Sequence, residues 1–134
     1  ENIFVSDTEK VMAILRNLHN LGLRISLDDF GTGYSTLHYL RSFPFDKVKI
    51  DKSFVEDLGT SRNGHAVIRA ITTLADALGM ETLAEGVENA GQYDVLEREG
   101  CRHIQGYLFS RPVAASAIAS LLADGAAYQR QLRA

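Results

Sequence analysis

Cysteine is almost absent from the sequence. Cys101 is the only one in 134 residues, which excludes an intrachain disulfide and a zinc site built from several cysteines. The lack of disulfides fits a reducing compartment, because disulfides persist mainly in oxidising ones. We therefore interpret Cys101 as a buried thiol without a chemical role and expect a cytoplasmic protein.

Long apolar runs are also missing. No run approaches the roughly 18 to 20 residues that a membrane-spanning helix needs, and the N-terminus has no signal-peptide pattern. We therefore expect this segment to be soluble and to make no membrane contact of its own. A membrane tether elsewhere in a longer parent protein stays open.

An excess of positive charge is lacking as well. Fourteen Lys and Arg residues against seventeen Asp and Glu residues give a net charge of −3. No basic surface is therefore expected to attract DNA, RNA or a membrane by bulk electrostatics. A phosphate-bearing ligand would need local positive charge or a metal ion.

What the sequence does contain is the composition of one globular domain, which we place at residues 1–134. Hydrophobic residues make up 46% and charged residues 23%, which is ordinary for such a domain. Helical periodicity and short alternating segments take turns along the chain, and the tail 124–134 is expected to fray. The expected helices cover residues 7–19, 34–43, 65–78, 89–99 and 110–123, and the expected strands lie within residues 23–29, 45–51, 80–88 and 102–109.

Two of the expected helices have distinct apolar stripes. In the helix capped by Asn89, we expect Tyr93 and Leu96 to be buried. In the longest helix, the stripe that we expect to be buried consists of Val67, Ile68, Ile71, Leu74, Ala75 and Leu78.

Strands that alternate with helices at this spacing predict right-handed crossovers and a parallel sheet, so the fold class is α/β. Each expected strand has an apolar face, such as that of Val48 and Ile50, and a polar face. Because parallel sheets are normally apolar on both faces, the polar face is expected to line a site or a wet interior. Its positions are Ser26, Asp28, Lys49, Asp51, Glu85, His103 and Gln105.

Two neighbouring carboxylates stand out in the stretch SLDDFGTGYST. Asp28 lies at the C-terminal end of a strand, where α/β folds collect their chemistry. We expect Asp28 to face the interior and Asp29 to turn into the following loop, with one or two divalent cations offsetting their repulsion. Gly31 and Gly33 allow that loop to turn sharply and to approach a ligand closely.

Each of these features also has a simpler interpretation. The DDFGTG stretch could be a solvated turn, Lys49 a surface lysine, and Asp51 its ion-pair partner or a helix cap. Glu85 and Glu88 could be helix-entry carboxylates that favour the macrodipole. Gln105 could satisfy a buried backbone group, and His103 could contact a ligand or be structural. His19, His38 and His65 show no metal-ligand spacing.

The combination of motifs is more specific than any single one. In order, LDDFGTGYSTLHYLRSFPFDKVKIDKSFV, LAEGVE and GCRHIQGYLFSRP closely resemble the second half of the EAL domain, a bacterial family of phosphodiesterases that hydrolyse cyclic di-GMP. The resemblance spans residues 1 to about 122. It implies a parallel (β/α) half-barrel, whose four β/α units are equivalent to the C-terminal half of a TIM-like EAL barrel of about 250 residues. The parent protein could then be tethered to the bacterial inner membrane.

The resemblance also implies a two-metal site for Mg²⁺ or Mn²⁺. Asp28 and Asp29 match the aspartates of the family's DDFGTG motif, of which the first coordinates metal and the second binds the second ion. Glu85 is similar to a glutamate that serves the second metal or acts as general base. Lys49 resembles the lysine that orients the attacking water and neutralises phosphate charge, and Asp51 resembles a carboxylate near the second ion.

Further positions are assigned by the same resemblance to the substrate pocket and to the glycine loop. Glu88 and Gln105 match residues that shape the pocket for cyclic di-GMP, and Arg111 and Pro112 are weaker candidates for the same pocket. Glu1 aligns with a glutamate that anchors the glycine loop and links it to metal binding and dimerisation.

The sequence departs from the family in one respect. It contains no EAL or EVL tripeptide, and the other ligands of the family's first metal site belong to the N-terminal half of the barrel. We therefore expect this fragment alone to be inactive. Its open sheet edges are expected to drive association, either with the missing N-terminal half or with a second copy in a homodimer.

Three alternatives to a phosphodiesterase remain open at this stage. The parent could be a cyclic di-GMP receptor or regulatory module that binds without cleaving. The chain could be a stand-alone interaction protein built on a half-barrel dimer. It could also be an unrelated phosphate-binding α/β barrel, which the order of the motifs disfavours.

Overall fold

A computed structural model describes residues 8–31, 40, 43, 45–58 and 62–123 of the chain. Within these residues, four strands form one sheet in the order β1 (Ser26–Phe30), β2 (Lys47–Ile50), β3 (Glu81–Ala84) and β4 (His103–Ile104). Every neighbouring pair is parallel. The predicted α/β class and parallel sheet are confirmed.

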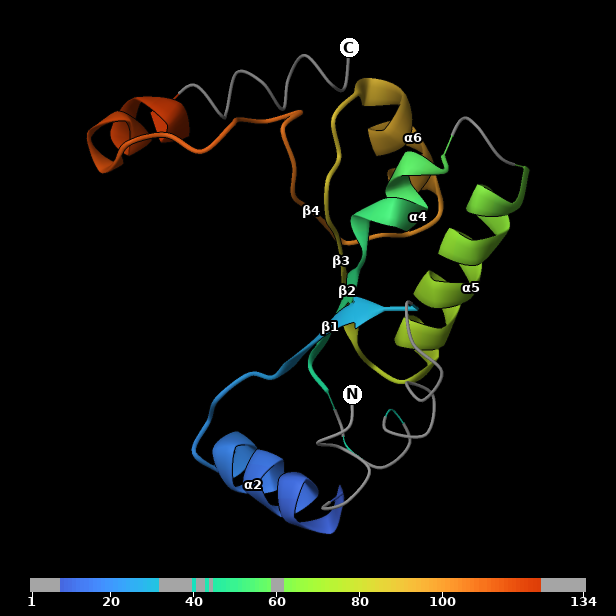
Figure 1. Cartoon of the computed structure of the whole chain (residues 1–134), viewed down its shortest axis with the longest axis vertical. Helices are drawn as coiled ribbons and strands as arrows, with labels where there is room; N and C mark the ends of the chain where they lie inside the picture. The colour runs from blue at the N-terminus through green and yellow to red at the C-terminus, as the bar shows by residue number, and fades with distance from the viewer. Residues whose placement is uncertain (1–7, 32–39, 41–42, 44, 59–61, 124–134) are drawn as a thin grey trace.

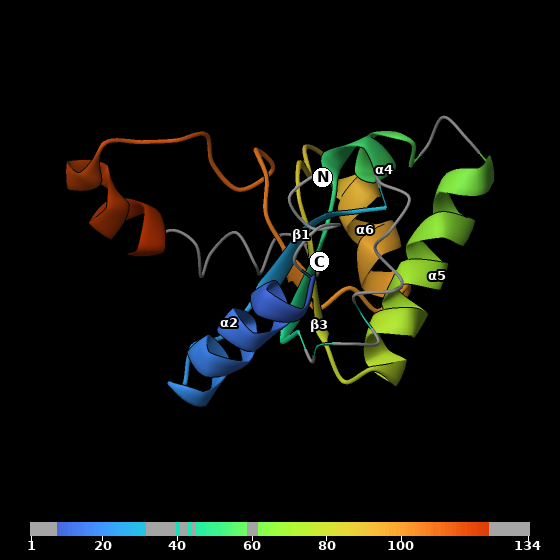
Figure 2. The ribbon, with the colours of Figure 1, turned by 60° about the horizontal axis from the view of Figure 1, so that its bottom comes forward.

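Helices connect the strands. The longer ones are α2 (Thr8–Asn20), α5 (Arg62–Ala77) and α6 (Ala90–Arg98), and the short ones are α4 (Lys52–Glu56) and the 3₁₀ helix η1 (Ala115–Ala117). Figures 1 and 2 show α4, α5 and α6 on the same side of the sheet. None of the described helices combines the length and the apolar character that a membrane crossing requires.

The expected helices 7–19, 65–78 and 89–99 and the four strands are found close to their expected bounds. The final helix was expected from residue 110, but residues 110–114 are not helical and η1 begins at Ala115, because Pro112 disfavours a helical conformation at Arg111. The expected helix 34–43 lies almost wholly outside the described residues, as do the tail 124–134 and Gly33. α4 was not expected. It forms because the Asp51 side chain accepts a hydrogen bond from the Ser53 backbone N–H at 2.9 Å, which caps its first turn.

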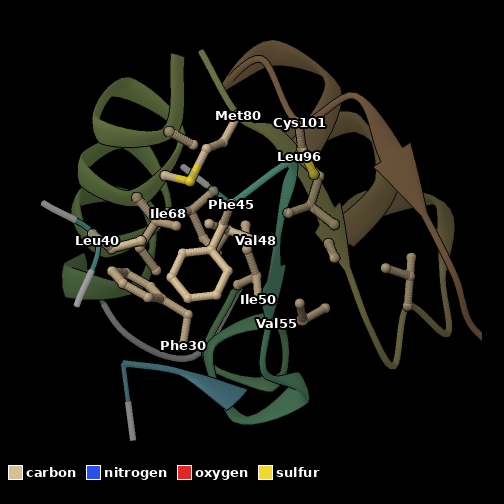
Figure 3. Packing of buried hydrophobic residues seen from close by; sticks show 14 of the residues in the cluster. Phe30, Leu40, Phe45, Val48, Ile50, Val55, Ile68, Met80, Leu96 and Cys101 are labelled. Carbon is tan, nitrogen blue, oxygen red and sulfur yellow. The ribbon is translucent and has the colours of Figure 1, made fainter. Parts of the chain in front are cut away.

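The apolar face of β2 is the centre of the core. Val48 is 1% exposed and Ile50 is fully buried, as the alternating pattern predicted. Both pack with Ile68 of α5 in the same apolar cluster (Figure 3). The sheet is therefore fixed by apolar contacts on the side of the helices, which leaves the side chains of its other face to form a site.

The predicted burial is wrong for one residue of the apolar stripe on the longest helix. Leu78 is 45% exposed, whereas Ile68, Ile71 and Ala75 are buried. The helix ends at Ala77, and Gly79 then adopts a φ of +73°. This turn directs Met80, which is 6% exposed, into the core in place of Leu78. In α6, Leu96 is fully buried as expected, but Tyr93 is only partly buried.

The capping of α6 is as predicted. The Asn89 side chain accepts from the Gln92 N–H at 3.0 Å, and the Gln92 side chain accepts from the Asn89 N–H at 3.3 Å. Gln92 also donates to the Val55 carbonyl oxygen at 3.2 Å. This capping box therefore fixes α6 against the end of α4, beside the C-terminal ends of the strands.

Candidate active site

Three carboxylates converge at the C-terminal ends of the strands. Asp28 and Asp29 belong to β1, and Glu85 follows β3, with β2 between them. One oxygen from each of the three lies within 4.8 Å of the other two. Residues that are 57 positions apart in the sequence therefore form one acidic cluster.

A bulge in β1 brings the two neighbouring aspartates together. The strand register passes from Leu27 opposite Val48 to Phe30 opposite Ile50, so β1 holds one more residue than β2 over this stretch. Asp29 has a φ of +51°, a left-handed conformation that is uncommon outside glycine. The expectation that Asp29 turns into the loop is thus corrected, because the extra residue cancels the alternation of a regular strand.

The following glycine supports this arrangement. Gly31 has a φ of +100°, and a Cβ atom at this position would lie 2.7 Å from the ring of Phe54 in α4. No other residue fits there without moving that ring. The sharp turn expected at Gly31 is present, and its close approach is to the Phe54 ring, whereas its expected approach to a ligand stays a prediction.

Lys49 lies between the carboxylates. Its Nζ donates to Asp28 Oδ2 at 2.8 Å and lies 2.6 Å from Glu85 Oε1. The hydrogen bond from Lys49 lowers the pKa of the Asp28 carboxyl below its ordinary value of 3.8. Hydrogen bonds to Asp28 and then to Glu85 raise the pKa of Lys49 above 10.5. At neutral pH the site therefore holds a charged lysine and an ionised Asp28.

The donor set fits a hard divalent cation. Asp28, Asp29 and Glu85 offer only carboxylate oxygens, which are the ligands that Mg²⁺ and Mn²⁺ prefer. The ammonium group of Lys49 already holds a positive charge between two of them. The space between the carboxylates is thus compatible with a cation in both charge and ligand chemistry.

Asp51 lies outside this cluster. Its Oδ1 accepts hydrogen bonds from the Ser53 N–H at 2.9 Å and from the Ser53 Oγ at 2.6 Å. The Ser53 hydroxyl is the main cause that lowers the pKa of Asp51. The structure therefore assigns Asp51 the capping function that the sequence left open, and it does not group Asp51 with the other three carboxylates.

A pocket of about 330 Å³ adjoins the cluster at Glu85. It lies at the C-terminal ends of β2, β3 and β4 and contains two residues expected to bind substrate, Glu88 and Gln105. The Gln105 backbone is fixed by a hydrogen bond from its N–H to the Ala84 oxygen at 2.8 Å. The residues that line the pocket are Asp51, Lys52, Glu56, Glu85, Gly86, Glu88, Gln105, Gly106 and Tyr107.

The remaining predicted site residues lie elsewhere. Arg111 and Pro112 do not line this pocket, although the guanidinium carbon of Arg111 lies 4.6 Å from the centre of the Tyr107 ring. Glu1 lies outside the described residues. His103 Nε2 is 3.4 Å from Glu81 Oε2, and this pair lies nearer the other end of the sheet than the carboxylate cluster does.

A larger cavity of about 760 Å³ follows β4 and includes His103. Of the predicted site residues, it contains only His103 and Gln105, and none of the three clustered carboxylates. We therefore place the candidate active site at the smaller pocket, because this concave surface adjoins the carboxylate cluster at Glu85.

Sequence reasoning missed several residues of the pocket wall. Tyr107 is 49% exposed and lines the pocket, and Gly86 and Gly106 line it as well. A Cβ atom at Gly86 would lie 2.6 Å from Lys52 Cβ, and one at Gly106 would collide with the backbone of Val87. The motifs EGVE and QGY contain these residues, so the sequence held a signal for them. The sequence-based prediction assigned site functions only to the glutamates and the glutamine of these motifs.

Comparison with known proteins identifies the family. The model of the EAL domain matches residues 1–112. Cyclic di-GMP phosphodiesterase NbdA of Pseudomonas aeruginosa is 39% identical over 122 residues, which are 91% of this chain and 16% of NbdA. In general, the chain spans 14% to 20% of the length of the curated relatives that it matches.

Two solved structures show the same fold over most of the chain. The EAL domain of Mycobacterium smegmatis DcpA is 44% identical with a TM-score of 0.84, over 93% of this chain and 56% of that one. Klebsiella pneumoniae BlrP1, solved with manganese and cyclic di-GMP, is 35% identical with a TM-score of 0.74, over 81% of this chain and 28% of that one. By the match to its sequence and by its four-stranded parallel sheet, this chain belongs to the EAL domain family.

Proposed function

We propose that this chain is part of a metal-dependent phosphodiesterase that hydrolyses cyclic di-GMP to linear pGpG. We further propose that residues 1–134 form the C-terminal half of its EAL domain. The observation that carries the proposal is the convergence of Asp28, Asp29 and Glu85 around the Lys49 ammonium. NbdA is named as an enzyme of this kind, and BlrP1 was solved with manganese and the same dinucleotide.

The clustered carboxylates would hold the metal. Asp28, Asp29 and Glu85 supply oxygen ligands for Mg²⁺ or Mn²⁺, and Asp51 is proposed as a further carboxylate for a second ion, through the oxygen that does not cap α4. A bound ion supplies Lewis-acid activation of water and neutralisation of phosphate charge.

The chain's own residues bind and orient the reactants. Lys49 offers a positive charge for a phosphate oxygen and a donor that orients the attacking water. Water adds to phosphorus, the bond to the 3′ oxygen breaks, and that oxygen leaves with a proton. Glu88 and Gln105 line the pocket beside Glu85 and would position the dinucleotide. Arg111, whose guanidinium lies over the Tyr107 ring, and Pro112 are proposed as weaker contributors to substrate binding from outside this pocket, and Glu1 is proposed to anchor the glycine loop.

The segment 1–134 by itself is proposed to be inactive. Within the part of the chain that the structure describes, the three clustered carboxylates and Asp51 are fewer ligands than two ions require, so we propose that further ligands come from an N-terminal half or from a second copy. We expect no cyclic di-GMP turnover by residues 1–134 with Mn²⁺. Robust hydrolysis by a monomer of this segment would contradict this part of the proposal.

A chimera tests the enzyme itself. The N-terminal half of an EAL domain is taken from DcpA, whose aligned part is 44% identical to this chain, and is joined to residues 1–134. We expect hydrolysis of cyclic di-GMP with Mn²⁺, reduced about 100-fold or more by Asp28→Asn or Glu85→Gln. Lys47→Met, on the same strand as Lys49 but outside the cluster, is the control that keeps its activity. Unchanged turnover after Asp28→Asn would contradict the proposal.

A cyclic di-GMP receptor is the second candidate. Gln105 and Tyr107 line the pocket without belonging to the carboxylate cluster, so binding does not by itself require a metal. Calorimetry with the same chimera separates the two functions. Tight binding that is equal with EDTA and with Mn²⁺, together with no turnover, would favour the receptor.

A further inference from the structure

The Lys49 ammonium contacts three carboxylate oxygens of the acidic cluster. Its Nζ lies 2.9 Å from Asp28 Oδ1, 2.8 Å from Asp28 Oδ2 and 2.6 Å from Glu85 Oε1. These oxygens come from β1 and from the end of β3, on either side of β2. One ammonium group therefore links the two strands across the centre of the cluster.

Lys47 shows what an ordinary lysine on the same strand does. It belongs to β2 two positions earlier, and its exposure of 25% is close to the 23% of Lys49. Its Nζ is 3.5 Å from Glu81 Oε2. The difference between the two lysines is thus their contact with the cluster and not their burial or their strand.

The same oxygens are the proposed metal ligands. A divalent ion between Asp28 and Glu85 would need the lone pairs that Lys49 now occupies, and it would repel the ammonium group at such short range. The ammonium and the ion therefore exclude each other from this position. The lysine is long and flexible enough to leave by rotating its side chain.

We propose that Lys49 is a built-in competitor for the metal, which holds Asp28 and Glu85 together until a divalent ion displaces it toward the pocket. This inference rests on the proposed metal site and adds a function of Lys49 that precedes the reaction. The displaced ammonium then faces the pocket beside Glu85, where the phosphate of the substrate is expected. Metal binding and the positioning of Lys49 are coupled by this exchange.

Preorganisation of the carboxylates by Lys49 would change the metal affinity in the opposite direction from competition. If Lys49 served mainly to arrange the carboxylates in advance, its removal would let them separate and would weaken metal binding. If it competes, its removal frees the oxygens and strengthens binding. The affinity of the segment for a metal alone decides between these effects, without any measurement of activity.

The experiment is a titration of residues 1–134 with Mn²⁺, in which electron paramagnetic resonance measures the free ion. We expect Lys49→Met to lower the Kd by about tenfold or more, a factor that corresponds to ~1.4 kcal/mol. Lys49→Arg keeps the positive charge, and Lys47→Met removes a charge from the same strand. Both are expected to stay within about threefold of the wild-type Kd. An unchanged or weaker affinity in Lys49→Met would overturn the inference.

Asp28→Asn separates failure of the inference from failure of the proposed metal site. Loss of binding in Asp28→Asn, with equal affinity in the wild type and in Lys49→Met, would leave the metal site standing and would remove the competition. If neither the wild type nor Lys49→Met binds Mn²⁺ more tightly than Asp28→Asn does, both proposals fail.

A second experiment uses only the wild type, so it does not depend on whether a variant folds. Nitrogen-15 spectra of the lysine ammonium groups are recorded with and without Mg²⁺. We expect the Lys49 signal to shift and to lose its couplings to carboxylate carbons when Mg²⁺ is added, while the Lys47 signal stays unchanged. A Lys49 signal that keeps these couplings at saturating Mg²⁺ would overturn the inference.

Discussion

Asp28 belongs to β1 and Glu85 directly follows β3, two strands that are not neighbours in the sheet, yet one ammonium group contacts both carboxylates, at 2.8 and 2.6 Å. Two features of the fold produce this relationship. The parallel register places Lys49 opposite Leu83, two residues before Glu85, and the bulge in β1 lets both Asp28 and Asp29 reach the same point. The position of the site therefore follows from strand pairing and from one extra residue.

Asp51 offers a test that separates capping from metal binding. Asn is as good an N-cap as Asp, so Asp51→Asn is expected to change the free energy of unfolding by less than about 0.5 kcal/mol. The loss of a carboxylate near a second ion should lower turnover of the chimera by about tenfold or more. Urea unfolding and the turnover assay measure the two effects. Full turnover in Asp51→Asn would limit this residue to its capping function.

Asp51→Ala is the matched comparison, because it removes both the cap and the charge. We expect a loss of about 1 kcal/mol of stability in this variant. Equal stability of Asp51→Ala and Asp51→Asn would show that the hydrogen bonds to Ser53 contribute little.

The ion pair of Arg69 and Glu99 predicts a pH dependence of stability. Two hydrogen bonds of 2.8 and 3.0 Å join α5 to the end of α6. The Arg69 guanidinium lowers the pKa of Glu99 below its ordinary value of 4.5. A lowered pKa in the folded state stabilises the protein above pH 4.5, and this contribution is lost as the pH falls through the folded-state pKa.

Arg69→Met should therefore lower the urea midpoint at pH 7, and the difference from the wild type should shrink as the pH falls below 4.5. Urea titrations of both proteins at several pH values from 7 down to 3 measure this difference. A difference that stays constant over the whole range would mean that Arg69 stabilises the fold through packing of its aliphatic part.

Gly106 packs so closely against the backbone of Val87 that a side chain at this position would clash. A Cβ atom there would meet the backbone of Val87, whose N–H donates to the Gln105 oxygen at 3.1 Å. Gly106→Ala is expected to cost about 1 to 3 kcal/mol of stability and to weaken cyclic di-GMP binding by displacing Gln105. Urea unfolding and calorimetry of the chimera test both effects.

Gly91→Ala in α6 is the control for this prediction. A Cβ atom at Gly91 would lie 3.3 Å from Asn89 Oδ1, and Ala favours a helix over Gly. We expect this variant to be neutral or slightly stabilising. A similar loss in both variants would show that Gly106 is not a special position.

The sequence predicted the elements that depend on local patterns. Alternation in β2 identified Val48 and Ile50 as core residues, and both are buried. The position of Asp28 and Glu85 at strand ends predicted that they would meet, because parallel strands share one C-terminal edge. The structure brings them together as expected.

What the sequence could not predict depends on pairing between distant segments. The bulge that turns Asp29 into the cluster is a mismatch between β1 and β2, and it leaves no signal in either strand alone. The exposure of Leu78 depends on where α5 ends, since one residue of difference moves a side chain by about 100° around the helix. Tyr107 lines the pocket because β4 pairs with β3, a pairing between segments that are distant in the sequence.

The central claim is that Asp28 and Glu85 share a divalent cation. Anomalous diffraction from crystals of residues 1–134 grown with Mn²⁺ tests it directly. We predict an anomalous peak in contact with both carboxylates, with the Lys49 ammonium moved away from them. Crystals at saturating Mn²⁺ without a peak at this position, and with the two carboxylates splayed apart, would contradict the account.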